Sequence, residues 1–196
     1  MTIDVLIPTI NDIDVSIIEK TVSIANNIFV NKSNNSAAYN RNRLLDKSSA
    51  DIKIMIDDDI SGFYCGWDSD LLGVMGINNI VSARLMTSGN SPAHMNCFDE
   101  NKGLNDLQDD IIQIWPGETH IMPSSAFAFI DMGIRFDENY IGSGYEDTDF
   151  FRQYFVKYKT EFYVNNLCRL LHANEMKKQT ENLKINRDYY NKKWGK

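Results

Sequence analysis

Three consecutive aspartates follow an apolar segment, and this junction limits what the chain can fold into. The apolar segment is Ile52–Ile56, and Asp57, Asp58 and Asp59 come directly after it. Three carboxylates at the end of a buried strand repel one another unless a cation compensates their charge. In an extended backbone Asp57 and Asp59 point to one side and Asp58 to the other. The sequence therefore predicts that Asp57 and Asp59 hold a divalent cation, with a solvated acidic turn as the alternative.

Apolar segments of strand length alternate with segments of helical spacing along the chain. Strands are expected at residues 3–8, 52–56, 80–86, 111–114, 126–130 and 162–171. Helices are expected at 15–28, 36–47, 71–75 and 148–158, the second of them capped by Ser36. This alternation is typical of an α/β fold with a mostly parallel central sheet flanked by helices. Ligands of such sheets lie at the carboxyl ends of the strands, which is where the aspartates fall.

Length and charge restrict the class of protein further. The chain has 196 residues, 43% of them hydrophobic, and its net charge is -7. We expect one domain, residues 1–196, and no broad nucleic-acid-binding face, because the acidic field repels phosphates. The sequence lacks an apolar stretch of roughly 18 residues and a signal-peptide pattern, so no transmembrane segment is expected. Three cysteines without metal spacing, Cys65, Cys97 and Cys168, suggest reduced thiols and a cytoplasmic location.

A glycine-rich acidic segment lies in the second half of the chain. Gly142, Ser143, Gly144 and Tyr145 precede Glu146, Asp147, Thr148 and Asp149, and a helical pattern follows. The glycines allow the backbone to approach a ligand closely. Acidic residues in a first helical turn also complement the helix dipole, which is the structural alternative. In the functional interpretation, Asp147 or Glu146 is a general base for an incoming hydroxyl.

His172 ends the strand-like segment 162–171. A single histidine is more often structural than a ligand, and the other two histidines, His94 and His120, lie in loop-like surroundings. A histidine at a strand end beside carboxylates is nevertheless a suitable nitrogen ligand for a transition metal. The sequence therefore adds His172 to the candidate cation ligands.

The order of these motifs resembles that of a known family. IPT near the start, NRNRLL, DDD after an apolar strand, GSGYEDTDFFR and LLH follow one another between Ile7 and His172. This order is similar to that of GT-A-fold glycosyltransferases, whose domain is Rossmann-like. Within them it most resembles the β-1,4-galactosyltransferase and chondroitin-polymerase-like branch of inverting enzymes. The resemblance implies sugar transfer from a nucleotide-diphosphate sugar, expected to be a UDP-sugar, to a hydroxyl of a glycan or another acceptor.

The resemblance also implies roles for particular residues. It assigns six residues to the donor pocket: Pro8, Thr9, Tyr39, Arg41, Asp57 and Asp58. It assigns three to a Mn²⁺ or Mg²⁺ ion: Asp57, Asp59 and His172. It assigns Gly144, Tyr145 and Glu146 to the acceptor, with Asp147 as general base and Glu146 also counted as catalytic. Residues 1–86 would form the nucleotide-sugar half, residues 87–173 the acceptor half, and residues 174–196 a possible lid and C-terminal tail.

The chain departs from the family pattern at three places. Ser143 and Tyr145 stand where the galactosyltransferase branch has a tryptophan, so the acceptor sugar does not follow from the resemblance. Phe29 and Val30 barely provide the second strand that many relatives carry, which leaves uracil recognition as an expectation. Ser124 and Ser125 replace a glycine pair on the acceptor side.

Two other functions are compatible with an acidic α/β site. A nucleotidyltransferase acting on a sugar phosphate would also use metal-binding carboxylates, although it would usually have a glycine-rich, basic phosphate loop after the first strand. A non-catalytic carbohydrate-binding relative would keep the fold but would have lost an acidic residue or the histidine. The motifs favour the glycosyltransferase over both.

Overall fold

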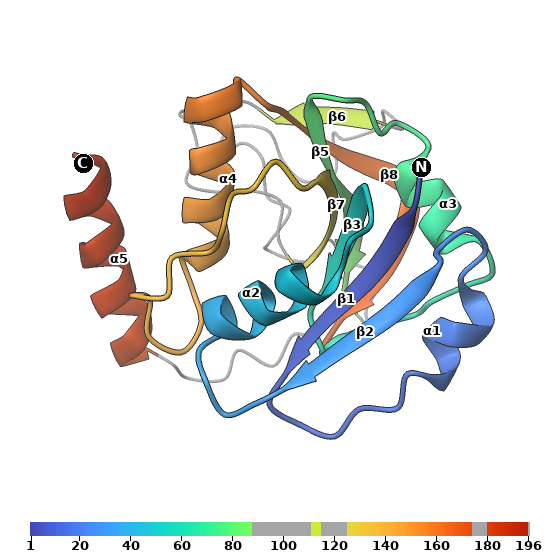
Figure 1. Cartoon of the computed structure of the whole chain (residues 1–196), viewed down its shortest axis with the longest axis horizontal. Coiled ribbons are helices and arrows are strands. Elements are labelled where there is room, and N and C mark those ends of the chain that lie inside the picture. Colours follow the sequence, from blue (N-terminus) through green and yellow to red (C-terminus); the bar gives the residue numbers. More distant parts are fainter. Residues whose placement is uncertain (88–110, 115–124, 174–179, 196) are drawn as a thin grey trace.

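The computed structural model describes residues 1–87, 111–114, 125–173 and 180–195, which build one sheet between two layers of helices (Figure 1). Its strands are β1 Ile3–Thr9, β2 Asn27–Lys32, β3 Ile52–Ile56, β4 Ile60–Ser61, β5 Asn79–Met86, β6 Ile111–Ile114, β7 Ala126–Ile130 and β8 Glu161–His172. Its helices are α1 Ser16–Thr21, α2 Ala37–Lys47, α3 Trp67–Leu72, α4 Glu146–Tyr158 and α5 Thr180–Trp194. The polar segment 88–110 lies outside the described residues.

The eight described strands form one mixed sheet. Their order is β2-β1-β3-β7-β5-β8-β4, and β6 pairs with β8 at the side of this path. Parallel pairing joins β1 to β2 and β3, and it joins β5 to β8. Because β7 is antiparallel to both β3 and β5, these five strands run in one direction. The other three, β4, β6 and β7, run antiparallel to their neighbours. The predicted α/β class, with helices flanking one central sheet, is confirmed. The sheet is mixed, because four of its seven described strand pairings are antiparallel.

Each face of the sheet has its own apolar core, which explains why the strands are apolar throughout. On one face Val5 and Ile7 of β1 pack with Ile18 of α1 and with Trp67 of α3. On the other face Leu6 packs in a second cluster with residues of α2 and α4. Phenylalanines from β7 and α4 fill this second core: Phe127, Phe129, Phe150 and Phe151. Because successive strand residues alternate between the faces, both must be apolar.

The segment between the first helix and the second strand differs from the sequence prediction. A helix over 15–28 is wrong, because α1 ends at Thr21 and β2 occupies Asn27–Lys32. The expectation that this segment barely provides a strand is also wrong. The cause is a distant carboxylate: buried Asp68 of α3 accepts hydrogen bonds from the backbone N–H groups of Ser23, Ile24 and Ala25. These bonds fix the chain in a turn after α1, which local periodicity does not reveal.

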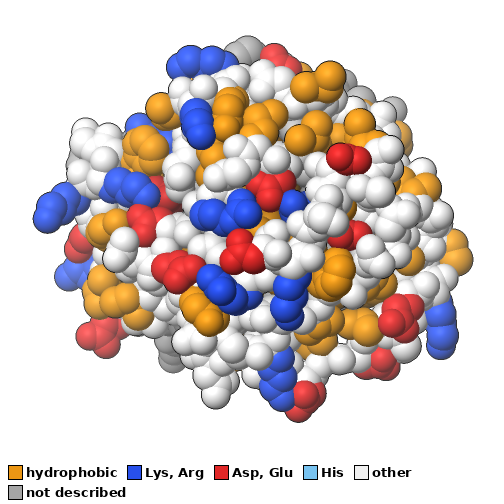
Figure 2. All heavy atoms as spheres, viewed as in Figure 1, with side chains coloured by type: hydrophobic (Ala, Val, Ile, Leu, Met, Phe, Trp, Pro, Cys, Tyr) orange, Lys and Arg blue, Asp and Glu red, His pale blue; other side chains and the backbone are white. Residues whose placement is uncertain are grey.

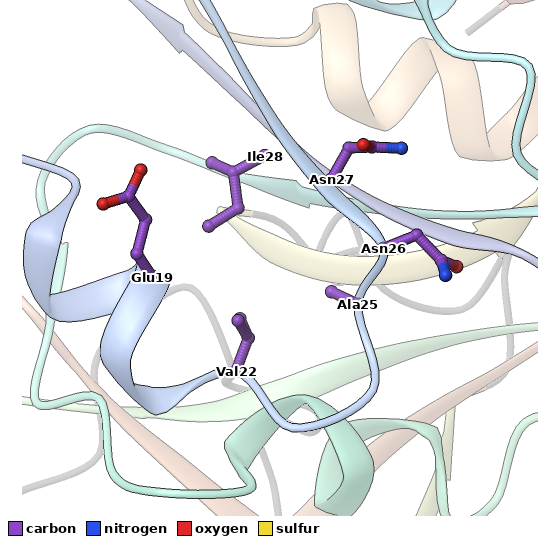
Figure 3. Close-up of a pocket in the computed structure, with 6 residues that line it drawn as sticks. All are labelled: Glu19, Val22, Ala25, Asn26, Asn27 and Ile28. Atoms are coloured by element: carbon purple, nitrogen blue, oxygen red, sulfur yellow. The ribbon is translucent and has the colours of Figure 1, made fainter.

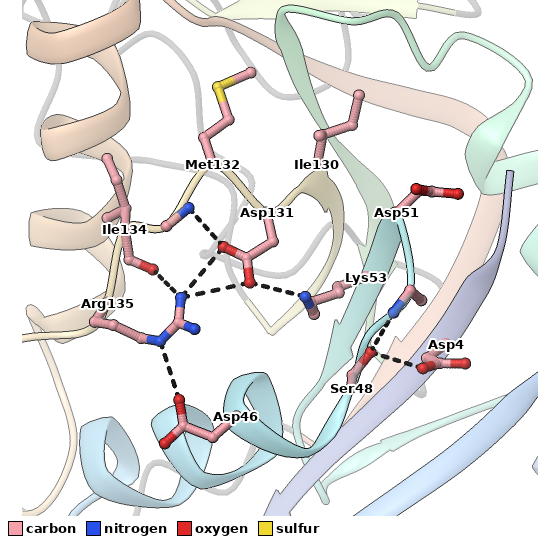
Figure 4. A network of polar contacts seen from close by, with 12 residues as sticks. Asp4, Asp46, Ser48, Asp51, Lys53, Ile130, Asp131, Met132, Ile134 and Arg135 are labelled. Carbon is pink, nitrogen blue, oxygen red and sulfur yellow. Dashed lines mark hydrogen bonds and ion pairs between the residues drawn. The ribbon is translucent and has the colours of Figure 1, made fainter.

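Polar contacts at the amino end of the sheet join α2 to the core strands (Figure 4). The Lys53 ammonium on β3 donates to Asp131 at 2.8 Å, and Arg135 contacts the same carboxylate at 3.2 Å. Burial by itself raises the pKa of Asp131, but Lys53, the Gly133 N–H and Arg135 together hold this pKa below its ordinary value. Arg135 also contacts Asp46 of α2. Acidic and basic side chains accordingly lie next to each other on this face of the molecule (Figure 2).

The C-terminal segment contains a helix that packs beside α4 (Figure 1). The Trp194 indole of α5 donates to Asp149 at 2.7 Å, and the Tyr189 ring meets Tyr140 edge-on at 5.0 Å. Tyr190 lies 5.5 Å from Tyr145, ring centre to ring centre. The aromatic residues of the tail therefore hold α5 on the body of the protein. Residues 174–179, part of the predicted lid, lie outside the described residues.

None of the described helices is long and apolar enough to cross a membrane. Of the three cysteines, Cys65 is exposed and Cys168 is buried, and both are free thiols. Cys97 lies outside the described residues.

We expect Lys193→Met to loosen α5 in a pH-dependent way. The Lys193 ammonium lies 2.6 Å from Asp137 and 2.9 Å from Asp149. Burial opposes ionisation of Asp137, but Lys193 and other donors lower its pKa to about 2. A lowered carboxyl pKa contributes stability above the ordinary value of 3.8, and this contribution disappears as the pH falls toward 2. The variant should lose about 1–3 kcal/mol of unfolding free energy at pH 7.

Urea unfolding of wild type, Lys193→Met and the neighbouring Lys192→Met checks this expectation between pH 7 and pH 3. Lys192 is exposed and no ion pair is described for it, so its variant should resemble wild type throughout. The gap between wild type and Lys193→Met should narrow below pH 3.8. A gap that stays constant with pH would contradict the assigned ion pairs.

Candidate active site at the carboxyl edge of the sheet

The candidate site lies at the edge where the five co-directional strands end. Thr9 ends β1, Ile56 ends β3 immediately before the three aspartates, and His172 ends β8. Strand β7 starts at the same edge, and the Asp57 N–H donates to the Ser125 carbonyl at 2.7 Å. The topology thus brings together motifs that are far apart in the sequence, as expected for ligand sites of α/β sheets.

Arg41 joins the strand end to the acidic start of α4. Its guanidinium donates to Asp57 Oδ1 at 2.7 Å and to Glu146 Oε1 at 2.6 Å. The Arg41 and Glu146 side chains are only 4% and 3% exposed, whereas that of Asp57 is 24% exposed. Burial by itself lowers the pKa of Arg41, but Asp57 and Glu146 raise it above its ordinary value. Arg41 is therefore a fixed buried cation whose two partners come from β3 and α4.

Asp58 faces the loop that follows β1. The Thr9 hydroxyl donates to Asp58 Oδ2 at 2.5 Å, and the Asn11 amide lies 3.3 Å from the same oxygen. Nearby, the buried Asn40 amide donates to the carbonyls of Thr9 and Ser33. Sequence reasoning missed Asn40, although it stands between Tyr39 and Arg41 of the quoted motif. These contacts join β1, β2 and α2 into one rigid wall beside the aspartates.

Asp59 and His172 meet although 113 positions separate them in the chain. Strand β4 pairs Ile60 with His172, and the Ala173 N–H donates to the Asp59 carbonyl at 3.0 Å. His172 Nε2 lies 3.5 Å from Asp59 Oδ2. Burial raises the pKa of Asp59, the His172 charge opposes the rise, and Asp57 and Asp58 add to it. Burial and repulsion from two neighbouring carboxylates thus disfavour the charged form of Asp59.

The oxygen and nitrogen ligands at this edge of the sheet fit a hard divalent cation in part. Two ligands at right angles on a small cation lie about 3 Å apart, close to the separation of Asp59 and His172. Asp57 keeps its second carboxylate oxygen, since only Oδ1 is bonded to Arg41. Within the described ranges, no three His, Cys, Asp or Glu side chains gather into a ready-made metal cage. The chemistry of the residues suits Mn²⁺ or Mg²⁺ without forming a closed site.

Glu146 and Asp147 open α4 in different surroundings. Glu146 is buried against Arg41, and burial raises its pKa to about 7 despite the opposing charge of Arg41. Burial also raises the pKa of Asp147, against the effects of Arg41 and the Thr148 N–H, while Asp57 adds to the rise. Asp147 Oδ1 accepts the Thr148 N–H at 2.6 Å. As a residue, Asp147 is partly buried, whereas Glu146 is only 2% exposed.

Two residues beside the site adopt a left-handed backbone conformation. Ser125 has φ 66° and Tyr145 has φ 71°, values that cost energy for residues other than glycine. Ser125 supplies the carbonyl that accepts the Asp57 N–H, and Tyr145 immediately precedes Glu146. Strained backbone of this kind is concentrated at functional sites. The serine pair noted in the sequence thus includes a position where a glycine would be unstrained.

Some of the sequence-predicted residues contact one another in the structure, and others lie apart. One electrostatic cluster contains Arg41, Asp57, Glu146 and Asp147. Asp59 lies two positions after Asp57 in the chain and contacts His172. Thr9 and Asp58 form a second contact, with Pro8 preceding Thr9 in β1. Tyr39 instead lies under the Arg43 guanidinium, 5.2 Å from its ring centre. Gly144 and Tyr145 form the turn that leads into α4.

A shallow hollow of about 230 Å³ lies elsewhere, between the end of α1 and the start of β2 (Figure 3). Its lining residues are Glu19, Val22, Ala25, Asn26, Asn27 and Ile28. It therefore adjoins the amino end of β2, whereas the aspartates follow the carboxyl end of β3. The hollow contains none of the predicted site residues.

Comparison with known proteins supports the fold and leaves the family open. No protein-family model matches the chain, and no curated protein matches its sequence. Among solved structures, a crystal structure of GalNAc-T7 with UDP, GalNAc and Mn²⁺ matches with a TM-score of 0.62 and 10% sequence identity. The match covers 90% of this chain and 44% of that chain.

The similarity shows that the fold is of the GT-A type, as the motif order predicted. At 10% identity it does not extend to a branch, so the resemblance to β-1,4-galactosyltransferases stays a prediction. The chain spans less than half of the matched protein, so donor, acceptor and metal come to this chain only as proposals.

We expect Arg41→Met to destabilise the protein strongly. The substitution leaves the carboxylates of Asp57 and Glu146 without their shared cation, and breaking a buried ion pair typically costs about 3–5 kcal/mol. Arg43→Met is the matched control, because Arg43 lies two positions away on α2 and forms a half-exposed pair with Asp46. Such exposed pairs contribute about 0–1 kcal/mol.

Urea unfolding at pH 7 measures both variants. If Arg41→Met does not fold, Glu146→Gln provides a milder test. The glutamine side-chain oxygen still accepts a hydrogen bond from Arg41, so this variant should fold with a smaller loss. Equal stability of Arg41→Met and Arg43→Met would refute the role given to Arg41.

Proposed function

We propose that the protein is a metal-dependent glycosyltransferase that moves a sugar from a nucleotide-diphosphate sugar to an acceptor hydroxyl. The observation that carries the proposal is the Arg41 bridge, which joins the aspartates after β3 to the acidic start of α4. Because of this bridge, the aspartates that would hold a cation and the carboxylate that would act as base belong to one edge of the sheet. The similarity to GalNAc-T7, whose structure contains UDP and Mn²⁺, supports the same class of donor.

The donor would lie against the β1, β2 and α2 wall. Asp58 is held by Thr9 and Asn11, so its carboxylate is oriented before a ligand arrives. Pro8 and Tyr39 belong to the same part of the chain and complete the proposed donor pocket. Arg41 would act there indirectly, since both of its ion-pair partners are carboxylates of the protein. A UDP-sugar is the donor that the family resemblance and the GalNAc-T7 match favour.

Asp59, His172 and the second oxygen of Asp57 would hold Mn²⁺ or Mg²⁺. When bound, a divalent cation at this edge would neutralise charge on the departing diphosphate. Burial raises the pKa of Asp59, and repulsion from Asp57 and Asp58 adds to the rise. Binding a cation would relieve this repulsion and would therefore stabilise the cluster of carboxylates.

Asp147 would act as the general base on the acceptor side. Asp147 is less buried as a residue than Glu146, and its raised pKa makes it a better proton acceptor than an ordinary aspartate. A base that assists direct attack by the acceptor hydroxyl is what an inverting transfer needs, and inversion is part of the proposal. Glu146 is buried on Arg41, so we assign it to holding the base segment. Gly144 and Tyr145 would border the acceptor.

We expect Asp59→Ala to abolish Mn²⁺-dependent binding of UDP while the protein stays folded. Removing one of three clustered carboxylates relieves repulsion, so the melting temperature should hold or rise slightly. Asp51→Ala is the control, because Asp51 is an exposed aspartate just before β3, at the opposite end of the strand. Titration calorimetry with UDP, with and without Mn²⁺, measures the effect. Unchanged Mn²⁺ dependence in Asp59→Ala would remove Asp59 from the cation site.

We expect Asp147→Asn to reduce sugar transfer by about 10²-fold or more, because the amide cannot accept the proton. Its affinity for UDP with Mn²⁺ should change little. Release of UDP from a panel of UDP-sugars, with glycan acceptors present, measures the rate, and Asp188→Asn on the exposed side of α5 is the control. Near-wild-type transfer by Asp147→Asn would leave Asp147 as a helix-start residue only.

A further inference from the structure

Helix α5 contacts the loop that leads into the acidic start of α4, and we propose that Asn186 of this helix is a positioning residue for that loop. The inference rests on the proposed function. Asn186 holds residues 141–144, and this keeps Glu146 on Arg41 and Asp147 at the carboxyl edge of the sheet.

One side chain contacts four backbone groups of this loop. Asn186 Oδ1 accepts the Ile141 N–H at 2.9 Å. Its Nδ2 donates to the carbonyls of Ile141 and Gly144, both at 2.9 Å, and lies 3.4 Å from that of Ser143. Asn186 is 1% exposed, so water does not replace these contacts. An amide is the side chain that both donates and accepts in this way, as a looping backbone requires.

The loop and the helix also fit each other closely. Gly144 has φ 104°, and a Cβ at this position would lie 2.8 Å from the Leu183 methyl carbon of α5. The Gly142 carbonyl accepts the Ala37 N–H at the start of α2 at 2.8 Å. The glycine-rich segment is thus clamped between α5 and α2. The glycines that sequence reasoning assigned to ligand approach have this packing role in the described structure.

Two further contacts fix α5 itself near the base segment. Trp194 and Lys193 both contact the buried Asp149, which lies in the first turn of α4 with Asp147. Tyr190, 3% exposed, packs on Tyr145. The helix therefore holds both the loop before Glu146 and the first turn of α4. None of these contacts involves the proposed donor wall of Thr9, Asn11 and Asp58.

This division of contacts makes the inference testable. We compare Asn186→Ala and Asn186→Asp with Asn182→Ala and Asn182→Asp. Asn182 is the same residue type one turn earlier on α5, and no hydrogen bond of its side chain is described. The aspartate variant keeps an acceptor for the Ile141 N–H but loses both N–H donors. Because its side chain has nearly the same size, an effect of this variant reports the lost hydrogen bonds and not a lost volume.

Hydrogen–deuterium exchange of residues 141–149 is the first measurement. We expect both Asn186 variants to exchange at least about tenfold faster there, because the loop loses its backbone partners. Both Asn182 variants should match wild type. The second measurement is steady-state transfer: kcat should fall about 10- to 100-fold, as expected when a reacting group is displaced. Affinity for UDP with Mn²⁺ should stay unchanged.

The outcomes separate the two proposals. Unchanged exchange in the Asn186 variants, or an equal change in the Asn182 variants, would overturn the positioning role. Faster exchange with an equal loss of UDP affinity would also overturn it, because the effect would then be a general loss of structure. If wild type releases UDP from no donor in the panel, the proposed function fails, while the exchange measurement still decides whether Asn186 holds the loop.

Discussion

The double ion pair of Arg41 is the interaction on which the candidate site depends. A guanidinium buried in the second core would be very unfavourable alone, and its two carboxylate partners make it tolerable. These partners come from the end of β3 and the start of α4, so the ion pairs fix the distance between the two acidic segments. A change in the packing of α2 would therefore move both acidic segments. Burial is the main reason why the neighbouring Asp147 has a raised pKa, and the Asp57 charge adds to the rise while Arg41 opposes it.

The site divides into two parts that have separate supports. On one side Thr9, Asn11 and Asn40 connect Asp58 to β1, β2 and α2 through hydrogen bonds. On the other side the loop 141–144 and the first turn of α4 depend on α5. Arg41 connects these parts through its ion pairs with Asp57 and Glu146, and the Ala37 N–H also joins them by donating to the Gly142 carbonyl. This arrangement is compatible with the transferase function that we propose, because donor and acceptor would be bound independently and then brought to one reacting centre.

Helix α5 shows how a polar terminal segment can become part of a site. Its sequence is rich in lysine and asparagine and has a weak apolar pattern, which is why a solvated tail was a reasonable expectation. Its attachment comes from a few polar and aromatic contacts with a buried carboxylate and an exposed loop backbone. Such contacts leave no periodic signal, because each depends on one partner that is distant in sequence. Asn186 is the clearest example, since a single amide replaces the hydrogen bonds that a regular element would provide.

The sequence by itself determined the α/β class, most strand positions, the Ser36 cap and the acidic edge of the sheet. These follow from local rules: apolar strands buried on both faces, helical spacing and cap chemistry. Motif order also led to the GT-A fold, and it named Arg41, Asp59, His172 and Asp147 before their positions were known. Only the tertiary structure decided that Arg41 serves carboxylates, that Asp68 ends α1 early, and that α5 holds the glycine-rich loop. Each of these is a contact between residues tens of positions apart, and its energy depends on burial and direction, which composition and periodicity do not encode.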